Sequence, residues 1–175
     1  NNISIAYPQN LETKIFLKKL NTKKIVNLGN LKYSETEDKK LDKISKQLNF
    51  QFNKKKIWVA SSTHQGEEIF CAEAHIILKK KIKGLITVII PRHIHRIKEI
   101  ISEINKLNLK ISIHSSKNKN LNDVDIYIVD TFGETKKFHK IGTSVFLGGS
   151  IIKRGGQNPL EAARYGAKIL HGPNT

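Results

Sequence analysis

The sequence predicts an α/β fold, a Rossmann-like parallel sheet with helices on both faces. Apolar runs of strand length alternate along the chain with amphipathic stretches of helix length, and no repeat interrupts the alternation. The run 85–90 is nearly all β-branched or leucine, which is typical of a strand buried on both faces. Strands that alternate with helices imply crossover connections, and such connections give a parallel sheet.

The expected strands are short apolar runs that end at a turn-forming residue. They span residues 25–28, 57–60, 85–90, 109–113, 124–129 and 145–147, and another strand begins within 167–170. Gly29, Pro91 and Gly148 directly follow three of these runs, and glycine and proline both disfavour continuation of a strand.

The expected helices lie between these strands and span residues 36–48, 67–81, 93–107, 134–140 and 158–165. In the helix 93–107, isoleucine and leucine recur at the helical period, which indicates one buried face. Glu67 and Glu68 open the helix 67–81, where the positive end of the helix dipole favours acidic side chains. Gly166 follows the last helix at a position that favours a left-handed cap.

The composition allows one ordinary domain with a core, because the chain has 175 residues of which 38% are hydrophobic. No apolar run approaches the ~20 residues that cross a bilayer as a helix. The formal charge of +16 implies attraction to nucleic acid, a membrane surface or a phosphorylated substrate, although the lysines are spread out and most are expected on solvated faces. Cys71 has no second cysteine to pair with, which fits a reducing compartment, and we interpret it as a small buried side chain.

The candidate site is the set of loops after the strands, because open parallel sheets bind ligands at the carboxyl ends of their strands. The strongest loop, 148–158, has one glycine pair at 148–149 and another at 155–156 around a basic segment. Glycines let backbone N–H groups approach a ligand, and the helix start at Asn158 and Pro159 favours a phosphate. Glu161, one turn further on, is placed to accept hydrogen bonds from ribose hydroxyls. The alternative is a glycine-rich turn with a capped helix, and the ending of a Walker motif is missing.

Two further loops carry cations and hydroxyls. Arg92 follows the most apolar strand, where a guanidinium binds phosphate bidentately or forms a surface ion pair. His93 is expected to cap the following helix or to contact a sugar. The loop 61–66, with its hydroxyls and glycine, predicts either an anion or sugar cradle or a capped helix start. His64 lacks the spacing of a zinc site and the other histidines do not supply it, so we expect no metal.

The loop 131–134 opens backbone access at Gly133. Phe132 is expected either to stack near a base or simply to pack. No nucleophile elbow and no Ser-His-Asp arrangement is present in the sequence pattern.

These four loops, in this order, resemble the Kdo (3-deoxy-D-manno-octulosonic acid) transferases. The similarity covers 58–68, 91–93, 130–134 and 145–161, and it ends in His171-Gly172-Pro173. Upstream, residues 29–32 resemble the segment that joins the two domains of that family. The combination of Gly-Gly-Ser with Gly-Gly-x-Asn-Pro-Leu-Glu is its most specific part.

The resemblance implies one half of a GT-B glycosyltransferase, in which two Rossmann-like domains face each other across a cleft. Such an enzyme transfers Kdo from CMP-Kdo, the donor substrate, to a tetra-acylated lipid A precursor at the cytoplasmic face of the inner membrane, without a cofactor. Residues 35–175 would be the donor-nucleotide-binding domain, incomplete at its carboxyl end, and 1–34 a remnant of the amino-terminal domain with the linker. The general base and the membrane contact would lie in that other domain, so we expect a chain truncated at both ends and inactive alone, with no nucleic-acid partner.

The resemblance also implies roles for individual residues. Arg92 would contact the donor phosphate and stabilise the leaving group, Glu161 would bind the ribose, and the amides of 148–150 would line the phosphate and sugar site. The expected donor-binding residues are Ser62, Thr63, His64, Gly66, Pro91, Arg92, His93, Thr131, Phe132, Gly133, Glu134, Gly148, Gly149, Ser150, Gly156, Gln157, Asn158 and Glu161. The chain departs from the family at Gln157, which replaces the usual histidine, and a neutral amide carries no proton or charge. It departs again at His171, where an aromatic residue is common.

Three alternatives remain open at the level of sequence. The chain resembles, more generally, a GT-B nucleotide-sugar transferase or epimerase that uses UDP. Its charge also fits a basic nucleic-acid-binding module, although aromatic residues make up only 7% and no recognised motif is present. A non-functional gene fragment is the third alternative.

Overall fold

The computed structural model describes residues 3–29, 44–117 and 120–175. The chain divides into two compact units, Asn1–Lys40 and Leu41–Thr175. Both this division and the domain boundary expected after residue 34 lie outside the described residues. No helix in the described ranges is long and apolar enough to span a membrane.

The smaller unit pairs two short parallel strands, β1 (Ile5–Ala6) and β2 (Lys24–Ile25), around helix α1 (Leu11–Lys19). Asn10 caps α1, because its side-chain oxygen accepts a hydrogen bond from Thr13 N at 2.8 Å. The predicted strand 25–28 overlaps β2 only at its first residue, and β1 and α1 were not predicted.

The larger unit is built on a parallel sheet with the strand order β5-β6-β4-β3-β7-β8 within the described residues. The strands are β3 (Lys56–Thr63), β4 (Leu85–Pro91), β5 (Ile111–Ile113), β6 (Ile126–Ile128), β7 (Ser144–Leu147) and β8 (Lys168–Leu170). All of its strand pairs are parallel, and every residue of β4 is buried. The predicted parallel sheet with a central strand at 85–90 is confirmed.

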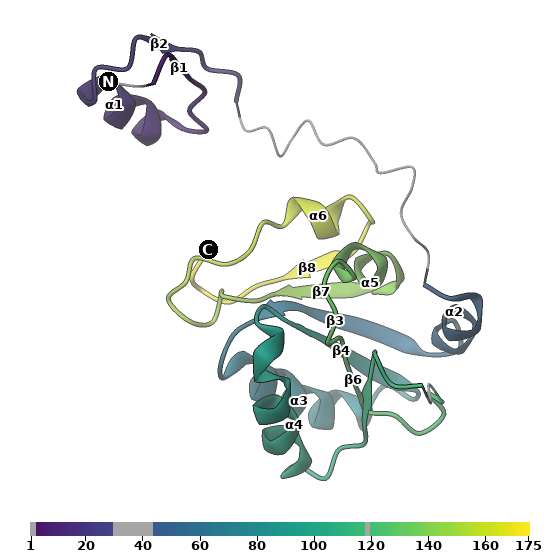
Figure 1. Ribbon diagram of the computed structural model, residues 1–175. Helices are drawn as coiled ribbons and strands as arrows, with labels where there is room; N and C mark the ends of the chain where they lie inside the picture. Colours follow the sequence, from purple (N-terminus) through teal and green to yellow (C-terminus); the bar gives the residue numbers. More distant parts are fainter. Residues whose placement is uncertain (1–2, 30–43, 118–119) are drawn as a thin grey trace. The chain divides into compact units, whose positions relative to one another are not determined.

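Helices cover both faces of this sheet (Figure 1). They are α2 (Lys46–Phe52), α3 (Glu67–Lys79), a 3₁₀ turn (Ile94–Arg96), α4 (Ile97–Asn105), α5 (Thr135–Ile141) and α6 (Leu160–Ala163). Alternate residues of β3 face opposite cores: Val59 packs with α2, α5 and α6, whereas Ala60 packs with α3 and α4. Cys71 is fully buried in the second core, as expected.

Three predicted helices differ from the structure. The predicted helix 93–107 is divided into the 3₁₀ turn Ile94–Arg96 and α4, which ends at Asn105. Of the predicted helix 36–48, residues 36–43 lie outside the described residues, and α2 begins only at Lys46, where Ser45 caps it by accepting from Leu48 N. The predicted helix 158–165 is reduced to the single turn α6. After Ala163 the chain continues as a turn, in which Tyr165 N donates to Ala162 O and Gly166 N donates to Ala163 O, before Gly166 adopts a φ of +74°.

Candidate functional site

Three loops meet at the carboxyl edge of the central strands. Strand β3 lies between β4 and β7, so the loops after these strands are neighbours. Arg92 N donates to Thr63 O at 2.9 Å, and Gly148 N donates to Ser61 O at 2.8 Å. The structure therefore brings the predicted segments 61–66, 91–93 and 148–156 together.

The first glycine of the 148–149 pair is required by close backbone packing. A Cβ on Gly148 would lie 2.2 Å from the carbonyl oxygen of Ser62 and 2.7 Å from Thr63 Cα. Ser62 itself adopts a left-handed φ of +54°, at the point where the register between β3 and β4 shifts. The two loops thus cross at a distance that only glycine permits.

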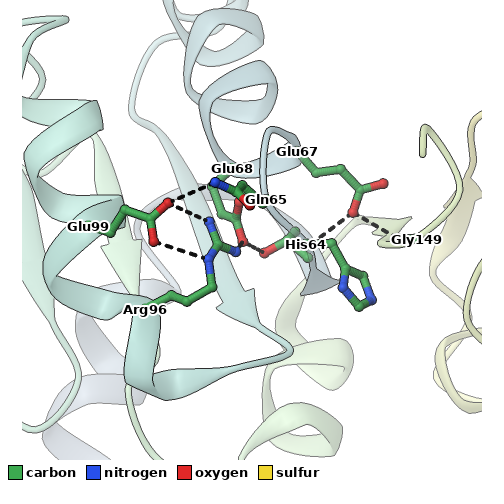
Figure 2. Close-up of polar contacts among 8 residues, drawn as sticks. His64, Gln65, Glu67, Glu68, Arg96, Glu99 and Gly149 are labelled. Atoms are coloured by element: carbon green, nitrogen blue, oxygen red, sulfur yellow. Dashed lines mark hydrogen bonds and ion pairs between the residues drawn. The ribbon is translucent and has the colours of Figure 1, made fainter. Parts of the chain in front are cut away.

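A buried carboxylate joins the loop after β3 to the loop after β7. Glu67, the first residue of α3, is 0% exposed, and its Oε2 accepts from His64 N at 3.0 Å and from Gly149 N at 2.7 Å. Its Oε1 accepts from Ile151 N at 3.1 Å. Figure 2 shows the Glu67 carboxylate between His64 and Gly149. Glu67 therefore does more than favour the helix dipole, because it links two loops whose residues are far apart in the sequence.

This arrangement corrects the expected use of the glycine-loop amides. Gly149 N donates to Glu67 and Gly148 N to Ser61 O, so neither of these amides is directed at a phosphate. The Ser150 hydroxyl is also engaged within the protein, since it donates to Leu147 O and accepts from Gly172 N at 2.9 Å. The physical reason is that buried backbone donors take an internal acceptor when one lies within reach.

A second buried carboxylate, Glu68, connects α3 to α4. Its Oε1 accepts from Thr63 Oγ1 and from Arg96 Nη1, both at 3.1 Å, and Arg96 also contacts Glu99 (Figure 2). Gln65 donates to Glu99 at 3.2 Å. Burial raises the pKa of the Glu68 carboxyl, and Arg96 opposes that shift. The sequence marked both glutamates only as favourable helix-start residues, and their partners depend on tertiary contacts.

Cationic side chains lie on the outer side of the same loops. Arg92 and His93 are exposed, and the His93 ring lies 5.7 Å from the His64 ring and 5.5 Å from the His95 ring. Burial lowers the pKa of His64; Glu67 opposes this, whereas the charges of Arg154, His93 and Arg92 lower the pKa further. The guanidinium groups of Arg92 and Arg154 therefore act on His64, and the Glu67 carboxylate acts against them.

The fourth predicted loop follows β6, which neighbours β4 at the same edge. Phe132 is 76% exposed, so its side chain is not packed in the core of the described chain. A Cβ added at Gly133 would meet no atom of the described residues within 4 Å. Glu134 lies against α5 and β5, 2.9 Å from Lys137 Nζ and 3.7 Å from His114 Nε2. Thr131 Oγ1 is buried without a hydrogen-bond partner among the described residues.

The remaining candidates lie around the start of α6. Asn158 Oδ1 accepts from Leu160 N at 3.0 Å, but the N-cap residue of α6 is Pro159, so the prediction that Asn158 is the N-cap is wrong by one residue. Gly156 N donates to Gly149 O at 3.1 Å, so the two glycine pairs close the loop on itself. Gln157 and Glu161 are half-buried there. Pro91 is the buried last residue of β4, and Gly66 has a φ of +89° directly before α3.

The fold and this edge define a class of protein, a Rossmann-like domain with basic side chains on the linked loops that follow the carboxyl ends of its strands. A 3-deoxy-D-manno-octulosonic acid transferase of Rickettsia felis is 35% identical to this chain over 153 residues, which are 85% of the chain and 32% of the relative. The corresponding enzyme of Haemophilus influenzae is 30% identical over 148 residues, 84% of the chain and 35% of the relative. No protein-family model matches the chain.

Among solved structures, the chain is similar to the C-terminal CMP-Kdo binding domain of WaaA from Acinetobacter baumannii. The TM-score is 0.67 at 25% sequence identity, and the match covers 74% of this chain and 70% of that one. The chain belongs to the Kdo transferase family, which is a family of glycosyltransferases, and its larger unit corresponds to the carboxyl-terminal domain. It spans about a third of the length of the curated relatives that it matches.

Proposed function

We propose that this chain supplies the donor-binding part of a glycosyltransferase that transfers Kdo from CMP-Kdo in lipopolysaccharide synthesis. Its relatives are named as Kdo transferases, and the similar solved domain is named for binding CMP-Kdo. The observation that carries the proposal is the convergence of the loops after β3, β4 and β7 on one edge, where the exposed Arg92 lies. A nucleotide phosphate is the anion that fits such an edge.

The position of Arg92 suits a phosphate ligand. Its backbone N–H is held by Thr63 O at 2.9 Å, which fixes the loop, while its side chain is exposed. Within residues 3–29, 44–117 and 120–175, the Arg92 guanidinium has no acidic partner, which argues against the surface ion pair considered from the sequence. When CMP leaves the donor, negative charge grows on its phosphate, and a fixed guanidinium there lowers the barrier.

The acceptor and the cellular location of the reaction are further proposals. A Kdo transferase acts on a lipid A precursor, so we propose peripheral contact with the cytoplasmic face of the inner membrane. The general base and the lipid contact are assigned to parts of the relatives' length that this chain does not span. We therefore expect no Kdo transfer from this chain alone.

Calorimetric titration of the chain with CMP tests the proposal, with UMP and GMP as matched nucleotides. CMP is expected to bind more tightly than either, and Arg92→Ala is expected to weaken CMP binding by about 2 kcal/mol, as for a lost charge-assisted contact. Lys98→Ala, which removes an exposed cation from α4, is the control and should bind CMP like the parent chain. Equal binding of all three nucleotides, or none, would contradict the proposal.

A further inference from the structure

We expect side chains to hold a donor phosphate at this edge, because three amides of the glycine loop already donate to acceptors within the protein. Gly149 N and Ile151 N donate to Glu67, and Gly156 N donates to Gly149 O. The helix that follows, α6, has only four residues and offers little dipole. Cationic side chains other than Arg92 are therefore expected to contact the phosphate.

Arg154 lies beside Gly149 and His64, which belong to two of the site loops. A Cβ on Gly149 would lie 3.5 Å from Arg154 Cβ and 3.5 Å from His64 Cδ2, so all three share one small surface. The turn that carries Arg154 is held by Arg154 N donating to Ile152 O at 2.7 Å and by the closure of Gly156 onto Gly149. Arg154 is thus presented by a bonded loop, not by a free segment.

The charge of Arg154 acts on the same point as the charge of Arg92. Both guanidinium groups lower the pKa of His64, Arg92 from the loop after β4 and Arg154 from the loop after β7. Glu67 is the acidic group that faces His64, and its two oxygens already accept three backbone N–H groups. Among the described residues, neither arginine has an ion pair or a side-chain hydrogen bond of its own.

We infer that Arg154 is a second phosphate-binding residue for the nucleotide donor and that it binds the phosphate together with Arg92, close to His64. The inference rests on the proposed function and adds a ligand to its site. Two guanidinium groups around one phosphate fix its orientation, because each offers a planar fork of N–H donors, and they stabilise the second negative charge that the phosphate gains when CMP is released. Lys153 precedes Arg154 and is also exposed, but its Cβ is not among the atoms closest to Gly149.

The test is a comparison of CMP with cytidine, which lacks the phosphate, on the 175-residue chain and two variants. Arg154→Gln is expected to weaken CMP binding at least about tenfold, as for a lost bond to a charged group, and to leave cytidine binding unchanged. Arg154→Lys should give an intermediate loss, since it keeps the charge without the fork. Lys153→Gln is the matched control and should bind CMP within about twofold of the parent, because its charge is solvated.

The outcomes separate the inference from the proposed function. If the parent chain binds CMP and Arg154→Gln binds it equally well, Arg154 is not a phosphate ligand and the inference is wrong. If Arg154→Gln weakens CMP and cytidine alike, the arginine shapes the nucleoside site and the inference is again wrong. If the parent chain binds no CMP, the proposed function fails first. Far-ultraviolet circular dichroism confirms that each variant is folded, which is expected because the replaced side chains are exposed.

Discussion

Replacing Glu67 with glutamine is expected to destabilise the larger unit by about 3 kcal/mol. The carboxylate accepts three backbone N–H groups, two on Oε2 and one on Oε1. Glutamine has a single acceptor oxygen, so its best orientation keeps the bonds from His64 and Gly149 and turns an NH₂ group toward Ile151 N. A buried donor left without an acceptor costs about 1–3 kcal/mol, and loss of the charge weakens the two bonds that remain.

The adjacent Glu68 supplies the matched control. Burial raises the pKa of its carboxyl, so a neutral side chain is better tolerated there. Glutamine at this position can still accept from Thr63 Oγ1 and Arg96, and Arg96 keeps its contacts with Glu99. We therefore expect Glu68→Gln to cost only about 1 kcal/mol.

Urea denaturation of both variants, with m-values compared, measures the difference. Amide hydrogen exchange in the folded state provides a local measurement, and exchange at Ile151 should accelerate in Glu67→Gln but not in Glu68→Gln. Unfolding of the two variants at the same urea concentration, with unchanged exchange at Ile151, would refute the idea that one carboxylate holds both loops.

Three further predictions concern packing, pH and reactivity. Gly148→Ala should lower the free energy of unfolding by more than about 3 kcal/mol or prevent folding, because its methyl group would lie 2.2 Å from the Ser62 carbonyl oxygen. Gly133→Ala should lower it by only about 1 kcal/mol, because a Cβ there meets no other atom of the described residues and the cost is that of its φ of +81°. Thermal unfolding of the two variants measures the difference. Burial lowers the pKa of His139 to about 4, whereas the unfolded chain binds this proton below about pH 6.5. The free energy of unfolding should therefore fall by about 3 kcal/mol between pH 6.5 and 4. In His139→Gln the free energy of unfolding should fall less over the same pH range, as measured by denaturation. Cys71 is buried and its pKa is raised, so a thiol reagent should modify it only after denaturation, and rapid labelling of folded protein would contradict its placement.

The sheet was predictable because its signal is local. Every residue of β4 is apolar apart from Thr87 and Pro91, and burial on both faces is the environment in which such a run is stable. The length of α6 was not predictable from the same kind of signal. The residues between Pro159 and Gly166 suit a longer helix, but α6 ends at Ala163 and Tyr165 and Gly166 instead make turn hydrogen bonds to Ala162 O and Ala163 O.

The meeting of the site loops was predictable, because the loops that follow parallel strands lie at the same edge of the sheet. The hydrogen bonds between these loops were not predictable. Arg92, His64 and Gly149 gather because the strands before them are parallel neighbours, which the alternation of elements predicts. The partner of Gly149 N is a side chain 82 residues away, and no local pattern indicates which donors a helix-start glutamate will reach. The sequence therefore predicted that these loops meet, but it did not predict that Glu67 accepts the hydrogen bond from Gly149 N.

The two adjacent glycines consequently have different physical roles. Gly148 is needed because the backbone of Ser62 passes within the space of a methyl group, whereas Gly149 is needed for its φ of +77°, which turns its N–H toward Glu67. Neither role is the approach of a ligand to bare backbone, which is the usual explanation of such a pair. Because Gly149 N already donates to the Glu67 carboxylate and Gly148 N to Ser61 O, a phosphate would gain little from these two amides and would depend on nearby cationic side chains. If CMP binds at this edge as proposed, its affinity should fall as salt is added, and an affinity that salt did not change would contradict a phosphate held by arginine side chains.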